Sequence, residues 1–167
     1  SGSIRLGNDG TFHVTGNTNI GAGLDVTGAI TSTGNLTLTS TDDGSVASPV
    51  VEFYRNSASP ADADLLGELK FTGEDDGGGK SLFAKITAKI DDASSGSEDG
   101  ALEFTLRKAN SNNIGARLTS TDLKLINGTG LEVAGDITST GDLTITNTYP
   151  RIYLTDTNHN SDFIIIN

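Results

Sequence analysis

The chain has 167 residues, of which 34% are hydrophobic but only 5% aromatic, and it has no cysteine, which excludes disulfides and thiolate metal sites. Its formal net charge of −11 and its scattered basic residues argue against nucleic acid as a partner. The longest apolar run, residues 163–166, is too short to span a membrane, so we expect no membrane partner.

Residues 4–41 predict a slender block of short strands, which we call the first shaft. Pairs of apolar residues two positions apart recur every twelve residues, and single isoleucines stand between them: Phe12 and Val14, Ile20, Leu24 and Val26, Ile30, Leu36 and Leu38. A spacing of two is strand spacing, because successive side chains of a strand point to opposite faces. Glycines such as Gly28 and Gly34 stand where the chain has to turn.

Part of this block is repeated. Residues 23–41, GLDVTGAITSTGNLTLTST, return as residues 130–148, GLEVAGDITSTGDLTITNT, with thirteen of nineteen positions identical. Each copy offers only a few apolar side chains, which are too few for a core within one chain. Such a ribbon is stable when it stacks on copies of itself or winds around other chains, so the pattern predicts a fibre.

Residues 42–122 predict a stouter antiparallel β domain, which we call the knob. Apolar and polar residues alternate from Val51 to Tyr54, Glu68 to Phe71, Leu82 to Ile90 and Leu102 to Arg107. This alternation is typical of an antiparallel sheet with its apolar face inward and its polar face in water. Turn residues separate the strands at 56–64, 73–80, 91–100 and 108–113. Because four of the six phenylalanines lie here, we expect a compact core in the knob.

Residues 123–148 predict a second shaft, because Leu123 and Leu125 restart the slender pattern. Residues 149–167 predict the start of a further β module. In this last stretch PRIYL, at 150–154, resembles PVVEF, at 49–53. The chain thus predicts an alternation of shaft and knob, as in a slice of a longer modular rod.

The shaft sequences LDVTGAITSTGNLTLTST and LEVAGDITSTGDLTITNT resemble the shafts of bacteriophage tail fibres. The string FYRNSASPADADLLGELKFTG, followed by SLFAKITAKI and SGSEDGALEF, is similar to a module that recurs in tail-fibre and virion-fibre proteins of phages, many of them marine. The resemblance implies a parallel homotrimer whose three chains intertwine about one axis. It also implies a place in the virion, outside the cell, joined to other segments of the same fibre and in contact with the host.

Physical reasoning supports a trimer as well, because three ribbons on one axis can point their apolar side chains into a shared narrow core and pair their strand edges. The fold class we expect is therefore all-β: an elongated, intertwined homotrimeric fibre with thin shafts flanking an antiparallel knob. The expected trimer core consists of Phe12, Val14, Ile20, Leu24, Val26, Ile30, Leu36, Leu38, Leu123, Leu125, Leu131, Val133, Ile137, Leu143 and Ile145.

We expect a structural role in host attachment, with no catalytic residue, metal or cofactor. The acidic clusters of the knob lack the ligand spacing of a calcium loop and lie in Gly/Ser-rich turns. A further hypothesis is contact with a host-cell glycan or protein through the knob loops, which reach outward. The residues proposed for this contact are Asn56, Asp62, Asp64, Glu74, Asp75, Asp76, Asp91, Asp92, Glu98 and Asp99.

Three alternatives stay open. The first is a bacterial surface adhesin stalk, because similar β repeats occur in adhesins. The second is an ice-binding β-solenoid, suggested by Thr-x-Thr pairs such as Thr31/Thr33 and Thr138/Thr140. The third is a fibre-borne depolymerase that would use the acidic clusters.

Overall fold

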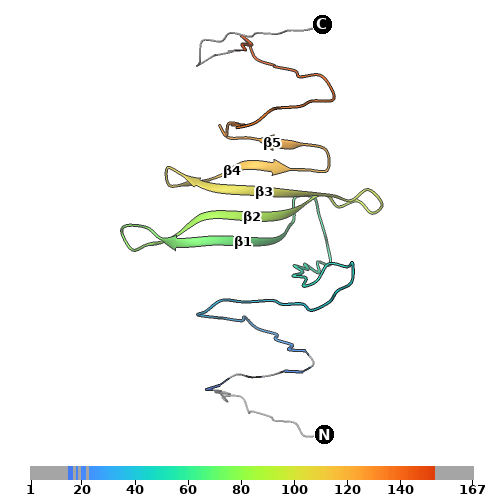
Figure 1. The fold of residues 1–167 in the computed structure, drawn as a ribbon, viewed down its shortest axis with the longest axis vertical. Helices are drawn as coiled ribbons and strands as arrows, with labels where there is room; N and C mark the ends of the chain where they lie inside the picture. Colours follow the sequence, from blue (N-terminus) through green and yellow to red (C-terminus); the bar gives the residue numbers. More distant parts are fainter. Residues whose placement is uncertain (1–14, 17, 19, 22, 153–167) are drawn as a thin grey trace. The chain divides into compact units, whose positions relative to one another are not determined.

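The computed structural model describes residues 15, 16, 18, 20, 21 and 23–152. The chain divides into two units, Ser1–Glu52 and Phe53–Asn167. The described residues of the first unit contain neither helix nor strand. The second unit contains a five-stranded antiparallel sheet and, over its described residues, no helix (Figure 1). The expected all-β character is therefore confirmed for the described part of the chain. Phe12 and Val14, two of the expected core residues, lie outside that part.

The sheet is a meander in which every strand pairs with its neighbour in sequence, in the order β1-β2-β3-β4-β5. This antiparallel arrangement confirms the sheet expected for the knob. The strands are β1 (Leu65–Glu74), β2 (Lys80–Asp92), β3 (Asp99–Lys108), β4 (Ser111–Leu118) and β5 (Leu123–Leu125). The last of them places Leu123 and Leu125 in the sheet, next to β4.

The connections between the strands use the turn residues noted in the sequence. Gly78, between β1 and β2, and Gly96, between β2 and β3, have φ angles of 77° and 90°, which glycine adopts without a steric penalty. Ala109 and Asn110 join β3 to β4, with φ angles of 46° and 65°. Two successive positive φ angles in a two-residue loop are typical of the hairpin turn whose twist matches that of its strands.

Some segments in which apolar and polar residues alternate do not form strands in the structure. The residues from Val51 to Tyr54, expected as a strand, form none, and neither do the described residues of the shafts other than β5. A strand needs a partner that takes its backbone N–H and C=O groups. The described part of this chain supplies such partners only within the five-stranded sheet.

The prediction that the knob has an apolar core of its own is wrong for the single chain. The only buried hydrophobic residue described is Ala101, while Ser81, Thr87, Glu103 and Thr105 are the buried polar ones. Large apolar side chains such as Phe71 and Leu106 are 56% and 57% exposed. The sheet is a single layer whose polar face is covered by its own long, ion-paired side chains, so burial is the reverse of the expected pattern.

Candidate functional site

The two repeated segments, residues 23–41 and 130–148, have the same turn in the structure. In the first, Ser32 donates its hydroxyl to the Gly34 carbonyl at 3.0 Å and accepts the Gly34 amide at 3.2 Å. In the second, the equivalent Ser139 makes the same two bonds with Gly141, at 2.8 and 3.3 Å. The same sequence around the turn thus gives the same pair of hydrogen bonds in both segments.

The apolar side chains of the repeats are exposed to matching degrees. Leu24 and its equivalent Leu131 are 68% and 74% exposed, while Leu36 and Leu143 are 81% and 78% exposed. The other three equivalent pairs agree as closely. Their exposures are 40% and 43% for Val26 and Val133, 75% and 72% for Ile30 and Ile137, and 47% and 43% for Leu38 and Ile145. Ile20 is 48% exposed. Every expected shaft-core residue that the structure describes is therefore uncovered within its own chain.

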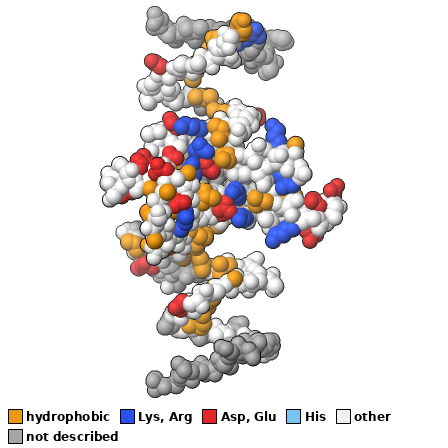
Figure 2. Space-filling model, turned by 180° about the vertical axis from the view of Figure 1, so that it is seen from behind, with side chains coloured by type: hydrophobic (Ala, Val, Ile, Leu, Met, Phe, Trp, Pro, Cys, Tyr) orange, Lys and Arg blue, Asp and Glu red, His pale blue; other side chains and the backbone are white. Residues whose placement is uncertain are grey.

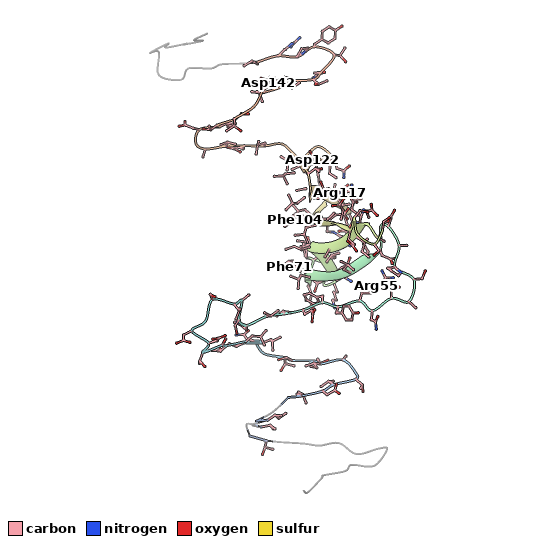
Figure 3. All side chains as sticks on the ribbon, turned by 90° about the vertical axis from the view of Figure 1, so that its right-hand side faces the viewer. Arg55, Phe71, Phe104, Arg117, Asp122 and Asp142 are labelled. Carbon is pink, nitrogen blue, oxygen red and sulfur yellow. The ribbon has the colours of Figure 1, made fainter. Side chains whose placement is uncertain are left out.

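The sheet carries a second exposed apolar surface, on the face that the alternation predicted as apolar but that was expected to be buried within the chain. Strand register places large apolar residues in rows across one face, and Phe71 and Phe104 lie on the same side (Figure 3). We call this the apolar face. Its residues are Leu69, Phe71, Ala84, Ile86, Ala88, Leu102, Phe104, Leu106, Ala116, Leu118, Leu123 and Leu125.

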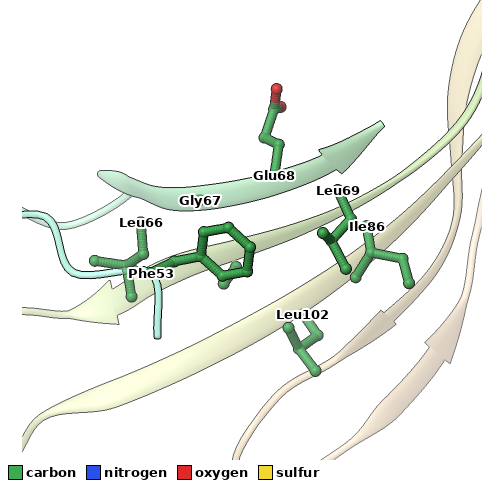
Figure 4. Close-up of a pocket in the computed structure, with 8 residues that line it drawn as sticks. Phe53, Leu66, Gly67, Glu68, Leu69, Ile86 and Leu102 are labelled. Atoms are coloured by element: carbon green, nitrogen blue, oxygen red, sulfur yellow. The ribbon is translucent and has the colours of Figure 1, made fainter. Parts of the chain in front are cut away.

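One corner of the apolar face is hollowed. Phe53 and Leu66 border this hollow, and Leu69, Ile86 and Leu102 form part of its lining. Glu68 points to the other side of the sheet (Figure 4). The hollow has no cluster of polar groups that would orient a small ligand, so its chemistry suits an apolar side chain.

The opposite face is polar and internally satisfied. Glu68 lies 2.8 Å from Lys70 Nζ and 2.5 Å from Lys85 Nζ, and it accepts the Thr87 hydroxyl at 3.3 Å. The hydrogen bonds from Lys70 and Lys85 lower the pKa of Glu68 to about 2. On β3, Glu103 accepts Nε of Arg117 at 2.9 Å. Figure 2 shows such charged side chains of both signs alongside the hydrophobic ones.

The acidic loop between β1 and β2 is stabilised by one of its own carboxylates. Asp75 accepts the amides of Gly77 and Gly79 at 3.0 and 2.9 Å, and the Ser81 hydroxyl at 3.2 Å. The hydrogen bond from the Gly79 amide is the main reason that the pKa of Asp75 is lowered. Asp75 is therefore a turn-forming residue, while its neighbours Glu74 and Asp76 are exposed.

The loop between β2 and β3 is organised in the same way, together with the strand ends beside it. The expected loop at 91–100 is shorter in the structure, since Asp91 and Asp92 end β2 and Asp99 begins β3. Asp92 accepts the Ser94 amide at 2.8 Å, and Glu98 accepts the Gly96 amide at 3.0 Å. These backbone hydrogen bonds lower the pKa of both carboxyls. Asp91 and Asp99 are exposed, and Asp91 lies 3.8 Å from Lys89.

The segment before β1 is held by two more acidic residues. Asp62 accepts the Ala93 amide at 2.8 Å and so ties this segment to the turn after β2. Asp64 pairs with Arg55 at 3.0 Å and accepts the Ala61 amide at 3.1 Å. The hydrogen bond from Arg55 is the main cause that lowers the pKa of Asp64. Asn56 is exposed.

The ten residues proposed for host contact thus fall into two groups. The carboxylates that accept backbone amides, as Asp75 does, serve the loops themselves. The side chains of the other five, which accept no backbone amide in the described part of the chain, are all exposed: Asn56, Glu74, Asp76, Asp91 and Asp99. Within residues 23–152 and the few described before them, no three His, Asp or Glu side chains come together as a metal site would require.

Comparison of the chain with protein-family models, curated proteins and solved structures gives no match. Among the described residues there is no helix with the length and apolarity of a membrane span.

Proposed function

We propose that this chain is a non-enzymatic structural segment of a bacteriophage tail fibre, in which three parallel copies form a shaft that extends and orients a host-binding tip. One observation carries the proposal: the two repeats present the same apolar side chains to solvent to nearly the same extent. A repeated set of exposed apolar side chains is expected where each set packs against other copies, and a fibre would bury these side chains between its chains.

Exposed apolar side chains support a partner of the same kind. Among the described residues, Leu24, Ile30 and Leu36 of the first repeat are 68%, 75% and 81% exposed. Apolar side chains of this size usually lie against other apolar groups. Burying apolar surface stabilises a complex by about 25 cal/mol per Å², so burial of these side chains between copies would strongly favour association. Charged surface elsewhere keeps the chain soluble before assembly, since its net charge is −11.

The decisive measurement is the mass of the eluting species by light scattering. Three copies of 17.2 kDa make 51.6 kDa, and we expect that mass over a range of concentrations. A folded 17.2 kDa monomer would overturn the trimeric fibre and return attention to a single-chain solenoid. If the mass is trimeric, virion genes beside the full-length gene would support the phage fibre over a bacterial adhesin stalk.

Contact with a host surface is a secondary part of the proposal. The exposed acidic residues at the ends of the knob strands and in the loops between them, such as Asp99 and Asp76, are free to contact a receptor outside the cell. A glycan array probed with the assembled protein tests this contact. Binding that Asp76→Ala or Asp99→Ala weakens would support it, and silence across the array would remove glycan contact without affecting the fibre role.

A further inference from the structure

The apolar face of the sheet is largely uncovered; Phe53 rests on it at one corner, against Gly67. Of its nine large side chains, Ile86 is half-buried and the other eight are 37–67% exposed: Leu69, Phe71, Leu102, Phe104, Leu106, Leu118, Leu123 and Leu125. At the size of leucine and phenylalanine side chains this leaves on the order of 700 Å² of apolar surface in water. That area is close to the roughly 800 Å² that each partner contributes to a stable protein–protein interface.

The composition of this face restricts what can cover it. The rows Leu102–Leu118–Leu123 and Leu69–Ile86–Phe104 contain no charged residue. A face without charges brings no like charges together when copies meet, so electrostatic repulsion does not oppose its packing against the same face of another copy. By contrast, the polar face already satisfies its carboxylates internally, as in the pair of Glu103 with Arg117, and Thr87 there is only 1% exposed.

The face is also continuous in sequence with the proposed shaft. Leu123 and Leu125 form its last strand, and Leu131 and Val133 of the second repeat follow within a few residues. A chain that places its repeat against other copies brings the face of β5 to those same copies. This continuity favours a second copy of the chain over an unrelated protein as the occupant of the face.

We propose that the apolar face packs against the apolar faces of other copies, so that the knobs share one core formed between chains. This inference rests on the proposed trimeric fibre, and it adds an interface within the knob, where sequence analysis expected a core inside each chain. The hollow bordered by Phe53 and Leu66 would receive a side chain of the neighbouring copy.

The absence of cysteine in the chain allows a direct test with single thiols. Leu106→Cys places a thiol on the apolar face, and Lys70→Cys places one on the polar face. Both parent residues are exposed in the single chain, where 57% of the residue Leu106 and 57% of the side chain of Lys70 are accessible. Leu69→Cys is a second reporter on the apolar face should Leu106→Cys fail to fold. Each full-length variant is labelled with a maleimide after its mass has been measured.

We expect the apolar-face thiols to react at least about tenfold more slowly than the Lys70→Cys thiol, because labelling requires the interface to open. Equal labelling rates in a trimer would overturn the inference and leave the fibre proposal standing. Slow labelling in a dimer would support the inference and overturn the threefold fibre. Slow labelling in a monomer would overturn both, because a segment of the same chain would then cover the face.

Discussion

Phe53 lies directly against Gly67, so closely that a β-carbon on Gly67 would stand 3.0 Å from the Cβ of Phe53. Few real β-carbons have so short a contact, and the opposing atom is fixed close to the backbone. The absence of a side chain at Gly67 is therefore what lets the segment before β1 rest on the sheet.

Gly67→Ala should destabilise the protein by about 1–2 kcal/mol, because the added methyl group has to displace Phe53 or bend β1. Urea unfolding followed by circular dichroism measures the change. Gly100→Ala is the matched control, since the nearest atom to its β-carbon would be 3.8 Å away, an ordinary contact. Equal stability of Gly67→Ala and the parent protein would show that Phe53 is not held against the strand.

Glu68 should make the stability of the sheet depend on pH. Its pKa is lowered to about 2 in the folded protein from 4.5, by hydrogen bonds from Lys70 and Lys85. Because the folded pKa is the lower one, this stabilisation is present above pH 4.5 and is lost as the pH falls toward 2.

Glu68→Gln should therefore cost about 1 kcal/mol at neutral pH, as expected of a partly exposed ion pair. The difference from the parent protein should shrink as the pH falls below 4.5 and should close at about pH 2, near the pKa of Glu68 in the folded protein. Denaturant unfolding at both pH values measures it, with Glu74→Gln at the exposed end of the same strand as control. A difference that stays constant with pH would contradict the proposed role of the carboxylate.

Asp75→Ala should lower the urea midpoint, because three donors lose their acceptor at once: the Gly77 and Gly79 amides and the Ser81 hydroxyl. Asp75→Asn keeps one acceptor oxygen and should restore part of the loss. Asp76→Ala, at the exposed neighbouring position, should leave the midpoint nearly unchanged. Equal effects of Asp75→Ala and Asp76→Ala would show that the carboxylate does not organise the turn.

The repeats permit a prediction in which each copy serves as the control for the other. If both bury their leucines between chains, Leu36→Thr and Leu143→Thr should lower the thermal midpoint of the assembled protein by similar amounts, each losing about 1–3 kcal/mol per buried side chain. Thr37→Ser, beside Leu36, should have little effect. A loss at one repeat alone would show that the two segments differ in their partners despite their common turn.

Much of the sheet could be predicted from sequence alone. Alternation at Leu102, Phe104 and Leu106 predicted a strand that the structure gives as part of β3, and the turn expected at 108–113 contains Ala109 and Asn110. These features depend on local chemistry, namely the period of a strand and the residues that tolerate a turn.

What covers each face could not be predicted in this way. Alternation states that Leu102 and Phe104 share a face, but it does not state whether that face meets another part of the chain or solvent. The same limit applies to the residues from Val51 to Tyr54, which alternate like a strand and form none. Strand formation and burial both require a partner. The two-residue period of apolar side chains does not indicate which segment that partner is.

The order of the strands has a consequence for how the protein folds. Since each strand of the meander pairs with the next along the chain, all of its strand pairings are local in sequence. Sheets with short-range pairings form faster than those built from distant segments. A single chain can therefore complete its sheet before it contacts another chain. During that interval the leucines and phenylalanines of the apolar face are exposed to water. High chain concentration during synthesis would shorten that interval, and dilution would prolong the aggregation-prone stage.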